Sequence, residues 1–380
     1  MKIAVVAPTY LPARRANTIQ VMKMAQALSR IGHIVRVSVP GEPAVSWEEL
    51  AGQYGLSQPF PVSWLPVRPR LRRYDYGFSA LRWARSWGAD LIYTRLPQAA
   101  ALASLQGIPV IHEVHDLPQG VLGPLLFRGF RAGRGARRLV LITHTLAEDL
   151  FEKFAIPGQP PFTLVAPDGV DLDRYRGLPS LSEARRVLQR EYHLPIQEES
   201  FVAGYTGHLY PGRGVEMMLA MAQTTPQITY LLVGGEKSAC ARLKESVMER
   251  GLTNVVLSGF VPNSLIPIYQ AASDVLLMPY QQHVAASSGG DIGRYLSPMK
   301  LFEYLAVGRP ILSSDLPVLR EVLTPKNAVL LPPEEVEAWV GALEELRRDP
   351  SKRNSLGEQA RADSLKFTWE QRAERIIAGV

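Results

Sequence analysis

The sequence predicts an α/β protein with two domains, each built around a doubly wound parallel sheet. Short runs rich in valine, isoleucine and leucine alternate with amphipathic segments along most of the chain. Such continuous apolar runs are typical of strands that are buried on both faces of a parallel sheet. The alternation begins at residue 2 and begins again at about residue 200, and 380 residues are enough for two hydrophobic cores.

In the first half, a strand over 2–7 leads into an amphipathic helix. Because asparagine is a favourable N-cap, Asn17 is expected to cap this helix, whose apolar residues recur at helical spacing as far as Leu28 before Gly32 ends it. The further strands of this half are predicted at 34–39, 90–94, 109–114, 138–143 and 162–166.

The second half repeats the pattern. Its strands are predicted at 201–206, 228–233, 255–258, 274–278, 310–313 and 328–331. Its helices are predicted at 214–223, 238–250, 263–272, 299–307 and 334–347. The stretch from Pro167 to about Pro195 separates the two series and is the expected linker region, and residues 351–380 are expected to form two helices with a break near 367–369.

Composition narrows the class of protein. The net charge of +6 is modest for this length, and 46% hydrophobic residues exclude a wholly disordered chain. The single cysteine, Cys240, excludes an internal disulfide framework and fits a reducing compartment. The apolar run at the start of the chain is too short for a signal peptide, and no run of about 18 apolar residues predicts a membrane span. We therefore expect a cytoplasmic protein.

A glycine-rich loop follows the strand over 201–206. Its sequence from Gly207 to Gly214 contains three glycines and Arg213, and a helix follows at once. Glycines let a backbone approach a ligand closely, and a helix N-terminus favours phosphate, so the loop is a candidate phosphate site. The alternative is an ordinary glycine-rich turn with a solvated arginine.

A second candidate lies in the segment from Ser297 to Ile311. Ser297 is a favourable N-cap ahead of a helix, and Lys300 places a cation in the first turn, where it opposes the helix dipole unless an anion binds there. Glu303, one turn further, is an acceptor that suits two vicinal hydroxyls. The alternative is a capped surface helix that carries an incidental lysine and glutamate.

These two segments resemble motifs of glycosyltransferase family 4, the retaining sugar-nucleotide transferases of GT-B fold. The segment from Ser297 to Ile311 resembles the family signature, and Gly207 to Gly214 resembles its diphosphate loop. The resemblance spans nearly the whole chain in the same order. It also includes residues 7–10, the helix 17–33, the histidine loop 113–118, the segment 166–171 and Trp369.

The resemblance implies a fold of two Rossmann-like domains that face a central cleft. Residues 1–170 would form the N-terminal, acceptor-binding domain, and residues 171–355 the C-terminal, nucleotide-sugar donor-binding domain. Residues 356–380 would form a C-terminal helix that packs back toward the N-terminal domain.

The resemblance also implies roles for individual residues. Glu303 would bind the ribose hydroxyls, Arg213 would replace a family lysine and neutralise the donor diphosphate, Lys300 would hold phosphate, and His115 would lie near the donor sugar. Backbone N–H groups from Met299 to Leu301 would help to hold phosphate. The expected donor-binding set is Gly207, His208, Gly212, Arg213, Ser297, Met299, Lys300, Leu301 and Glu303.

No metal or other cofactor is expected, because GT-B enzymes commonly stabilise the leaving group with fixed cations and helix N–H groups. The chain also departs from the family pattern. Tyr295 stands where many members have a first glutamate, and His208 stands where many have an arginine. Arg14, Arg15 and Asn17 lie where a glycine pair is usual; the arginines either reach an anionic ligand or form a solvated pair.

The acceptor is expected to be a hydroxyl-bearing molecule, with lipid-linked acceptors as one class. Leu125, Leu126, Phe127 and Phe130 are interleaved with arginines, which indicates a segment for peripheral contact with an anionic membrane. The alternative is a buried helix with a solvated basic face. Nucleic acid is not an expected partner, because no nucleic-acid motif accompanies the arginines.

The sequence as a whole therefore predicts a retaining glycosyltransferase. It would move a sugar from a nucleotide diphosphate donor (UDP-, GDP- or similar) to a hydroxyl in glycolipid, polysaccharide or other glycoconjugate synthesis. Two alternatives stay open: a catalytically degenerate nucleotide-sugar binding protein, and a GT-B nucleotide-sugar epimerase.

Overall fold

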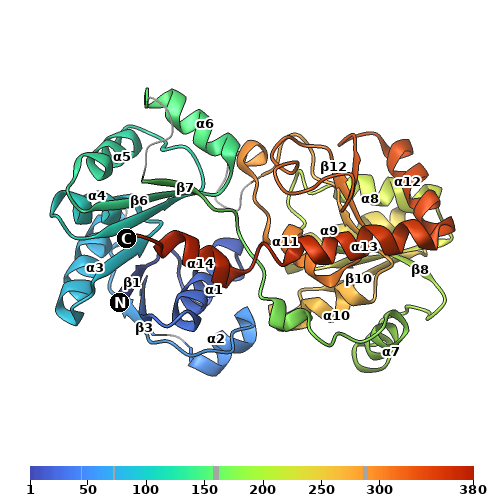
Figure 1. Ribbon diagram of the computed structural model, residues 1–380. Helices are drawn as coiled ribbons and strands as arrows, with labels where there is room; N and C mark the ends of the chain where they lie inside the picture. The colour runs from blue at the N-terminus through green and yellow to red at the C-terminus, as the bar shows by residue number, and fades with distance from the viewer. Residues whose placement is uncertain (44, 72, 157–161, 286–289) are drawn as a thin grey trace. The chain divides into compact units, whose positions relative to one another are not determined.

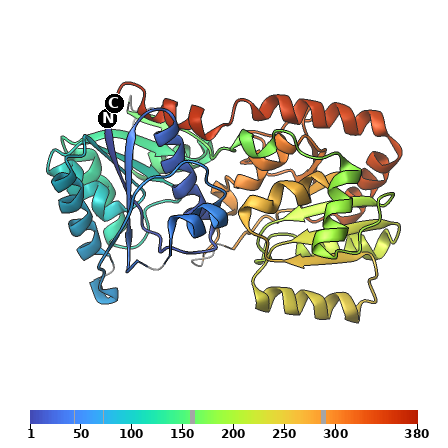
Figure 2. The same ribbon diagram turned by 90° about the horizontal axis from the view of Figure 1, so that it is seen from below.

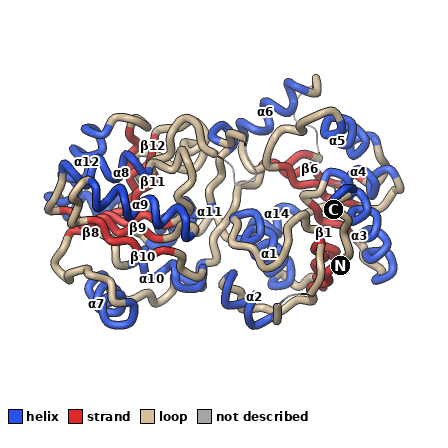
Figure 3. The backbone as a smooth tube through the Cα atoms, turned by 180° about the vertical axis from the view of Figure 1, so that it is seen from behind, coloured by secondary structure: helices blue, strands red, loops and turns tan. Residues whose placement is uncertain are grey.

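A computed structural model describes the chain except residues 44, 72, 157–161 and 286–289. The chain divides into two compact units. Unit 1 contains Met1–Asp168 and Trp369–Val380, and unit 2 contains Gly169–Thr368. Each unit has one sheet with helices on both of its faces (Figure 3). Among the described residues, no helix combines the length and apolarity needed to cross a bilayer.

Unit 1 contains a seven-stranded parallel sheet in the order β3-β2-β1-β4-β5-β6-β7. Figure 1 labels β1, β3, β6 and β7 of this sheet. β1 pairs with both β2 and β4, so the strand order reverses there, as in doubly wound folds. The strands are β1 (Lys2–Val6), β2 (Ile34–Pro40), β3 (Val62–Leu65), β4 (Leu91–Thr94), β5 (Val110–Val114), β6 (Ala136–Leu141) and β7 (Thr163–Val165). Successive residues of β1 from Ile3 to Val6 are all buried, because helices cover both faces.

The helices of unit 1 fall into two packed groups. α3, α4 and α5 pack side by side, whereas α1 packs on α14, the last helix of the chain. Both chain ends consequently lie near each other in this unit (Figure 2). The helices are α1 (Ala16–Arg30), α2 (Trp47–Tyr54), α3 (Tyr74–Trp87), α4 (Pro97–Leu105), α5 (Leu122–Ala132), α6 (His144–Lys153) and α14 (Trp369–Ile377).

Unit 2 contains a six-stranded parallel sheet in the order β10-β9-β8-β11-β12-β13. Its strands are β8 (Phe201–Thr206), β9 (Ile228–Val233), β10 (Val255–Gly259), β11 (Val275–Met278), β12 (Ile311–Ser314) and β13 (Val329–Leu331). Consecutive residues of β9 enter different cores: Leu231 packs in one apolar cluster and Leu232 in the other. This alternation explains the continuous apolar runs of the sequence.

The helices of unit 2 connect and cover these strands. They are α7 (Leu181–Tyr192), α8 (Val215–Thr224), α9 (Lys237–Glu249), α10 (Ile266–Ala271), α11 (Met299–Val307), α12 (Val336–Arg348) and α13 (Pro350–Ser364). The strand order reverses between β8 and β11, which pair through Ala203 and Val275. The glycine loop follows β8, at the carboxyl edge beside this reversal.

All twelve predicted strands are present, and the structure differs from the expected pattern in four other places. β3 was not predicted, because its four residues are half-buried at a sheet edge and form no continuous apolar run. The expected linker contains α7, which begins with a capping box of Ser180 and Glu183. Asn17 is not the cap of α1: Arg15 is, and its carbonyl accepts from Thr18 and Ile19.

The fourth difference concerns the end of the chain. The expected break near 367–369 is confirmed, because α13 ends at Ser364 and α14 begins at Trp369. Residue 356, however, lies inside α13 and not at the start of a separate segment. The units divide between Thr368 and Trp369, and again between Asp168 and Gly169, two residues before the expected 170.

Candidate active site

The glycine loop of unit 2 lies against the first turn of α11. Gly207 and Gly212 have φ angles of +147° and +81°. A Cβ atom at Gly207 would lie 2.7 Å from Nζ of Lys300, and one at Gly212 would lie 2.1 Å from the carbonyl oxygen of His283. Because only glycine fits both the backbone angles and the space, the loop can bring its backbone close to α11.

Lys300 has its ammonium group buried between aromatic rings. Its Nζ is 3.7 Å from the ring centroid of Tyr205 and 5.3 Å from that of Tyr280. Within the described part of the chain, no acceptor forms a hydrogen bond with Nζ. Burial, followed by the charge of Arg213, lowers the pKa of Lys300 well below its ordinary value, and Glu303 opposes this shift. An anionic ligand would supply the missing acceptor.

Arg213 also lies against Tyr280. Its Nη1 donates to the hydroxyl of Tyr280 over 2.9 Å, and its guanidinium carbon lies 5.0 Å from the centre of that ring. Its Nε has no hydrogen-bond partner among the residues that the structure describes. Two cations thus meet at one tyrosine without a carboxylate between them, an arrangement that favours a bound polyanion.

Glu303 is positioned by a glutamine of the neighbouring helix. Nε2 of Gln270 donates to Oε2 of Glu303 over 3.3 Å and to the hydroxyl of Thr206 over 3.1 Å. No other hydrogen bond to this carboxylate is made by the described residues. The remaining lone pairs can accept two hydroxyl groups of a ligand.

His208 does not supply the positive charge of the arginine that is usual in the family. Its ring stacks on Tyr210 at 4.8 Å and 8°. Burial, together with Arg213 and Lys300, lowers the pKa of His208 to about 4, so its imidazole is neutral at pH 7. This leaves Arg213 and Lys300 as the cations of the loop region.

Two expectations about the start of α11 were wrong. Pro298, and not Ser297, is the N-cap, since the helix begins at Met299 and no side chain caps it. The N–H of Leu301 donates to the carbonyl of Pro298 and is therefore not available to a phosphate. Met299 and Lys300 occupy the first two helical positions, where N–H groups have no intrahelical acceptor.

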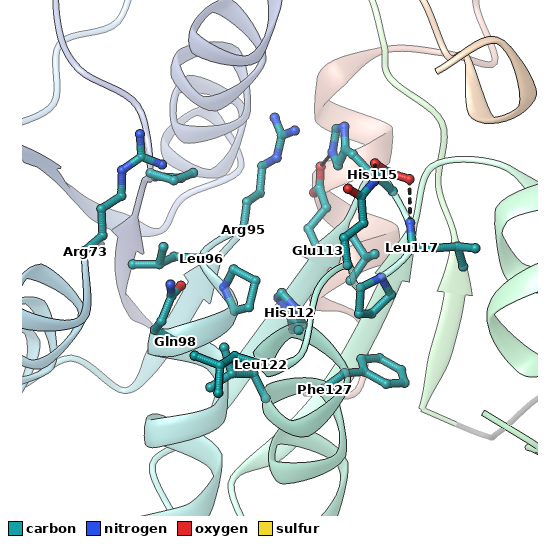
Figure 4. A pocket seen from close by; sticks show the side chains of 18 of the residues that line it. Arg73, Arg95, Leu96, Gln98, His112, Glu113, His115, Leu117, Leu122 and Phe127 are labelled. Carbon is teal, nitrogen blue, oxygen red and sulfur yellow. Dashed lines mark hydrogen bonds and ion pairs between the residues drawn. The ribbon is translucent and has the colours of Figure 1, made fainter. Parts of the chain in front are cut away.

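Unit 1 has its own cavity, of about 790 Å³, at the carboxyl ends of β4 and β5 (Figure 4). His115, which follows β5, lines it together with Glu113 and Arg95. The apolar part of the lining comes largely from α5 and the segments after β1 and β4 and includes Pro8, Leu96, Pro97, Leu122, Leu126 and Phe127. A cavity of this size and composition suits a small organic ligand.

His115 is held by a buried carboxylate. Its Nε2 hydrogen-bonds to Oε1 of Glu113, which also accepts from Nε2 of Gln20 over 2.6 Å. Burial, followed by the charge of Arg95, lowers the pKa of His115 to about 4, although Glu113 opposes the shift. The imidazole is therefore neutral at pH 7, with its proton on Nε2 and Nδ1 as an acceptor.

Glu113 is in turn held by the last helix of the chain. Arg372 on α14 places Nη2 3.1 Å from Oε2 of Glu113, and both side chains are almost fully buried. Arg372 also donates to the carbonyls of Ala166 and Pro167 over 3.1 and 2.8 Å. Burial raises the pKa of Glu113, but Arg372 and His115 lower it more, so the carboxyl stays ionised. Thus α14 holds a carboxylate that lines the cavity of unit 1.

The sequence matches two family models. Residues 191–363 match the model of glycosyl transferases group 1, and residues 18–174 match that of glycosyltransferase family 4. The chain belongs to glycosyltransferase family 4. It is thus a glycosyltransferase, and the prediction of the family is confirmed.

Individual relatives agree with this assignment. The glycosyltransferase is 28% identical over 305 residues to a 2-deoxystreptamine glucosyltransferase of Streptomyces kanamyceticus. The alignment covers 69% of this chain and 74% of the relative. It is 26% identical over 330 residues to a D-inositol 3-phosphate glycosyltransferase of Corynebacterium urealyticum. That alignment covers 79% of this chain and 73% of the relative. The crystal structure of Anabaena HepE in complex with UDP has a TM-score of 0.74 at 19% identity, with 99% and 98% covered, and shows that the fold is GT-B.

In this glycosyltransferase the expected residues fall into separate groups. Gly207, Gly212, Arg213, Lys300 and Glu303 gather around the loop of unit 2. His115 lines the cavity of unit 1. The expected residues at the start of α1 are exposed and do not line that cavity. They are Arg14, Arg15 and Asn17.

The segment expected to touch a membrane is divided between core and surface. Phe127 and Phe130 are buried, whereas Leu125 is 55% and Val121 83% exposed. The aromatic part therefore belongs to the core, as the alternative of a buried helix expected, and the exposed apolar surface lies at the start of α5.

Besides Arg372, three residues of these sites were not identified from the sequence. Arg95 directly follows β4, and its place at a carboxyl edge is a signal that could have found it. Gln270 and Tyr205 carry no motif, and their contacts depend on packing between distant segments. Outside the gaps at 44, 72, 157–161 and 286–289, no three histidine, cysteine or carboxylate side chains lie close enough to bind a metal ion.

Proposed function

We propose that this glycosyltransferase moves a sugar from a nucleoside diphosphate donor to a hydroxyl group with retention of the anomeric configuration. The observation that carries the proposal is a pair of cations beside a glycine loop: the buried ammonium of Lys300 and the half-buried Arg213, neither of which has a carboxylate partner among the described residues. The bound UDP in the structure of HepE supports a nucleoside diphosphate as the ligand.

The chemistry follows from where charge develops. The bond from the anomeric carbon to the diphosphate oxygen breaks, the bond to the acceptor oxygen forms, and the proton of the acceptor hydroxyl passes to the released diphosphate. Lys300, Arg213 and the N-terminus of α11 stabilise the charge that grows on the diphosphate. Glu303 accepts hydrogen bonds from the ribose hydroxyls, and His115 lies near the donor sugar. In this proposal the reaction needs neither a metal nor another cofactor.

The acceptor we propose is lipid-linked, and the protein binds the surface of an anionic membrane from the cytoplasm. The support is the exposed apolar surface of Val121 and Leu125 next to the exposed Arg128. Co-sedimentation with phosphatidylglycerol vesicles that is lost in Leu125→Glu would support this part. Equal sedimentation with phosphatidylcholine vesicles would contradict it.

A donor screen tests the proposed reaction. We expect one nucleotide sugar among UDP, GDP, ADP and dTDP conjugates to release its nucleoside diphosphate in the presence of a hydroxyl acceptor. The product should keep the anomeric configuration of the donor in its proton NMR couplings. Glu303→Ala should reduce both donor affinity and turnover, whereas Glu249→Ala on the exposed face of α9 should change neither.

Two other outcomes of the same screen would overturn the proposal. Ligand binding without turnover for any acceptor would indicate a degenerate nucleotide-sugar binding protein. A change of configuration within the nucleotide sugar, without an acceptor, would indicate an epimerase.

A further inference from the structure

The cavity of unit 1 has two chemically different sides. Figure 4 shows Arg73 and Arg95 extending from separate segments at one side, whereas Leu122 and Phe127 of α5 lie at the other. At about 790 Å³, the cavity exceeds what a single monosaccharide needs. Its shape and lining are therefore informative about the acceptor.

Arg73 is held in place without a carboxylate partner. Its guanidinium carbon lies 5.6 Å from the ring centre of Tyr10, and no described carboxylate forms an ion pair with it. Its φ angle of +68° lies in the left-handed region, which is unfavourable for a residue with a Cβ. Such strain is often found where a side chain is fixed for binding.

Arg95 is the second cation of the cavity. Its Nη1 donates to Oε1 of Gln20 over 2.9 Å, a neutral acceptor that leaves the charge of the guanidinium uncompensated at that contact. Burial, despite the opposing charge of Asp168, lowers the pKa of Arg95 to about 10, so it remains charged at pH 7. Two guanidinium groups can bind one phosphate or carboxylate by charge-assisted hydrogen bonds.

The two carboxylates that line the cavity already have partners within the protein. Glu113 is paired with the buried Arg372 and with His115. Asp116 accepts hydrogen bonds from the N–H of Leu117, over 2.7 Å, and from the side chain of Gln119. Glu113 is compensated by Arg372, and the charge of Lys153 acts on Asp116, so the guanidinium groups of Arg73 and Arg95 give the cavity a preference for an anion.

The apolar side continues to the surface of the protein. Leu122 lines the cavity and is 49% exposed, and the adjacent Val121 is 83% exposed. Large exposed apolar side chains at a cavity mouth fit a ligand whose apolar part extends out of the cavity.

We infer that the acceptor of this glycosyltransferase is an amphipathic anion. Its phosphate or carboxylate binds between Arg73 and Arg95, and its apolar part lies along Leu122 and Leu126. The inference rests on the proposed function, in that it takes the ligand of this cavity to be the acceptor. It excludes a cationic acceptor such as an aminocyclitol.

Binding of small amphiphiles to the full-length chain tests the inference. Isothermal titration would compare hexyl phosphate with hexylamine, 1-hexanol, inorganic phosphate and myo-inositol 1-phosphate. The tightest binder among UDP, GDP, ADP and dTDP would be present at saturation to occupy a diphosphate site in unit 2. We expect hexyl phosphate to bind at least tenfold more tightly than each of the others. Hexylamine binding as tightly as hexyl phosphate would overturn the inference.

Matched variants assign the binding to the two sides of the cavity. Arg73→Gln should weaken hexyl phosphate at least tenfold, whereas Arg70→Gln, an exposed arginine outside the cavity, should change it less than twofold. Leu122→Ser should weaken hexyl phosphate but not inorganic phosphate. Equal effects of Arg73→Gln and Arg70→Gln would overturn the anionic side.

The remaining comparisons separate the sources of phosphate and the two proposals. If myo-inositol 1-phosphate binds as tightly as hexyl phosphate and Leu122→Ser has no effect, the apolar side is overturned. UDP affinity and thermal unfolding, measured in the same variants, show whether each has folded. UDP binding without hexyl phosphate binding would overturn only this inference, whereas a chain that binds no nucleoside diphosphate would overturn the proposed function.

Discussion

At the scale of single residues, the central feature is a cation buried without an acceptor. Lys300 is covered by the rings of Tyr205 and Tyr280, and no described residue accepts a hydrogen bond from its ammonium. A bound anion would accept the hydrogen bonds that this ammonium lacks and compensate its charge. Arg213, whose Nε also lacks a described partner, completes the positive pair.

The depressed pKa of Lys300 predicts that binding of a nucleoside diphosphate takes up a proton. Burial and Arg213 lower the pKa of Lys300 in the empty site, whereas a bound diphosphate favours the charged form and raises that pKa again. Calorimetric titration at pH 8.5 in buffers of different ionisation enthalpy should show net uptake of up to about one proton. Lys300→Met should abolish it, and equal uptake in both proteins would contradict the assignment.

The Glu113 carboxylate is predicted to fix the tautomer of His115. In Glu113→Gln, His115 loses a charged partner, and we expect kcat to fall by about tenfold or more while KM for the donor changes little. Nitrogen NMR of the imidazole should show the proton on Nε2 in the wild type and a mixture in the variant. An unchanged tautomer with a lowered kcat would mean that Glu113 acts in some other way.

At the scale of elements, the glycine loop and α14 each have one feature that determines their place. The loop approaches the chain near His283 as closely as a missing Cβ allows. α14 is joined to the sheet of unit 1 by an arginine that reaches the buried end of β5. A single substitution can remove each of these two features.

Gly212→Ala is predicted to disrupt the loop. The new Cβ would lie 2.1 Å from a backbone oxygen that cannot move alone, so we expect a loss of about 2 kcal/mol or more in the free energy of unfolding, with weaker UDP binding. Gly251→Ala is the control: φ is +64°, but nothing lies within 4 Å of its Cβ, so it should cost about 1 kcal/mol and leave UDP affinity unchanged. Chemical denaturation and titration calorimetry measure both.

Arg372→Met is predicted to destabilise unit 1 strongly. It leaves the buried carboxylate of Glu113 without its ion-pair partner, which costs about 3–5 kcal/mol. The exposed Glu374→Gln on the same helix should be nearly neutral. Urea denaturation tests this, and the double variant Arg372→Met, Glu113→Leu should recover part of the loss; no recovery would argue against the pair as the cause.

At the scale of the whole molecule, the sequence predicts the buried strands better than the edge strand or the residues at which helices begin. Strands such as β9 are buried on both faces and leave continuous apolar runs, whereas the half-buried β3 leaves none. The capping roles of Asn17 and Ser297 were wrong because a favourable residue type does not determine where helical backbone begins.

The site was predictable where the chemistry is local. The glycines, Arg213, Lys300 and Glu303 lie in two short segments with motifs that can be recognised. Tyr205 and Tyr280, whose rings cover Lys300, and Gln270, which contacts Glu303, lie in distant segments of the chain. Their contacts therefore cannot be predicted from the spacing of residues in the sequence. The role of Arg372 was not predictable for the same reason, because 259 positions separate it from Glu113.

The central claim is that Lys300 and Arg213 of unit 2 bind the diphosphate of a sugar donor. Its most direct test is calorimetric titration of UDP, GDP, ADP and dTDP into the wild type, Lys300→Met and the control Lys244→Met on the exposed face of α9. We predict that one nucleotide binds best and that Lys300→Met weakens it about tenfold or more, about 1.4 kcal/mol, while Lys244→Met does not. Binding of none of the four, or equal affinity in all three proteins, would contradict the account.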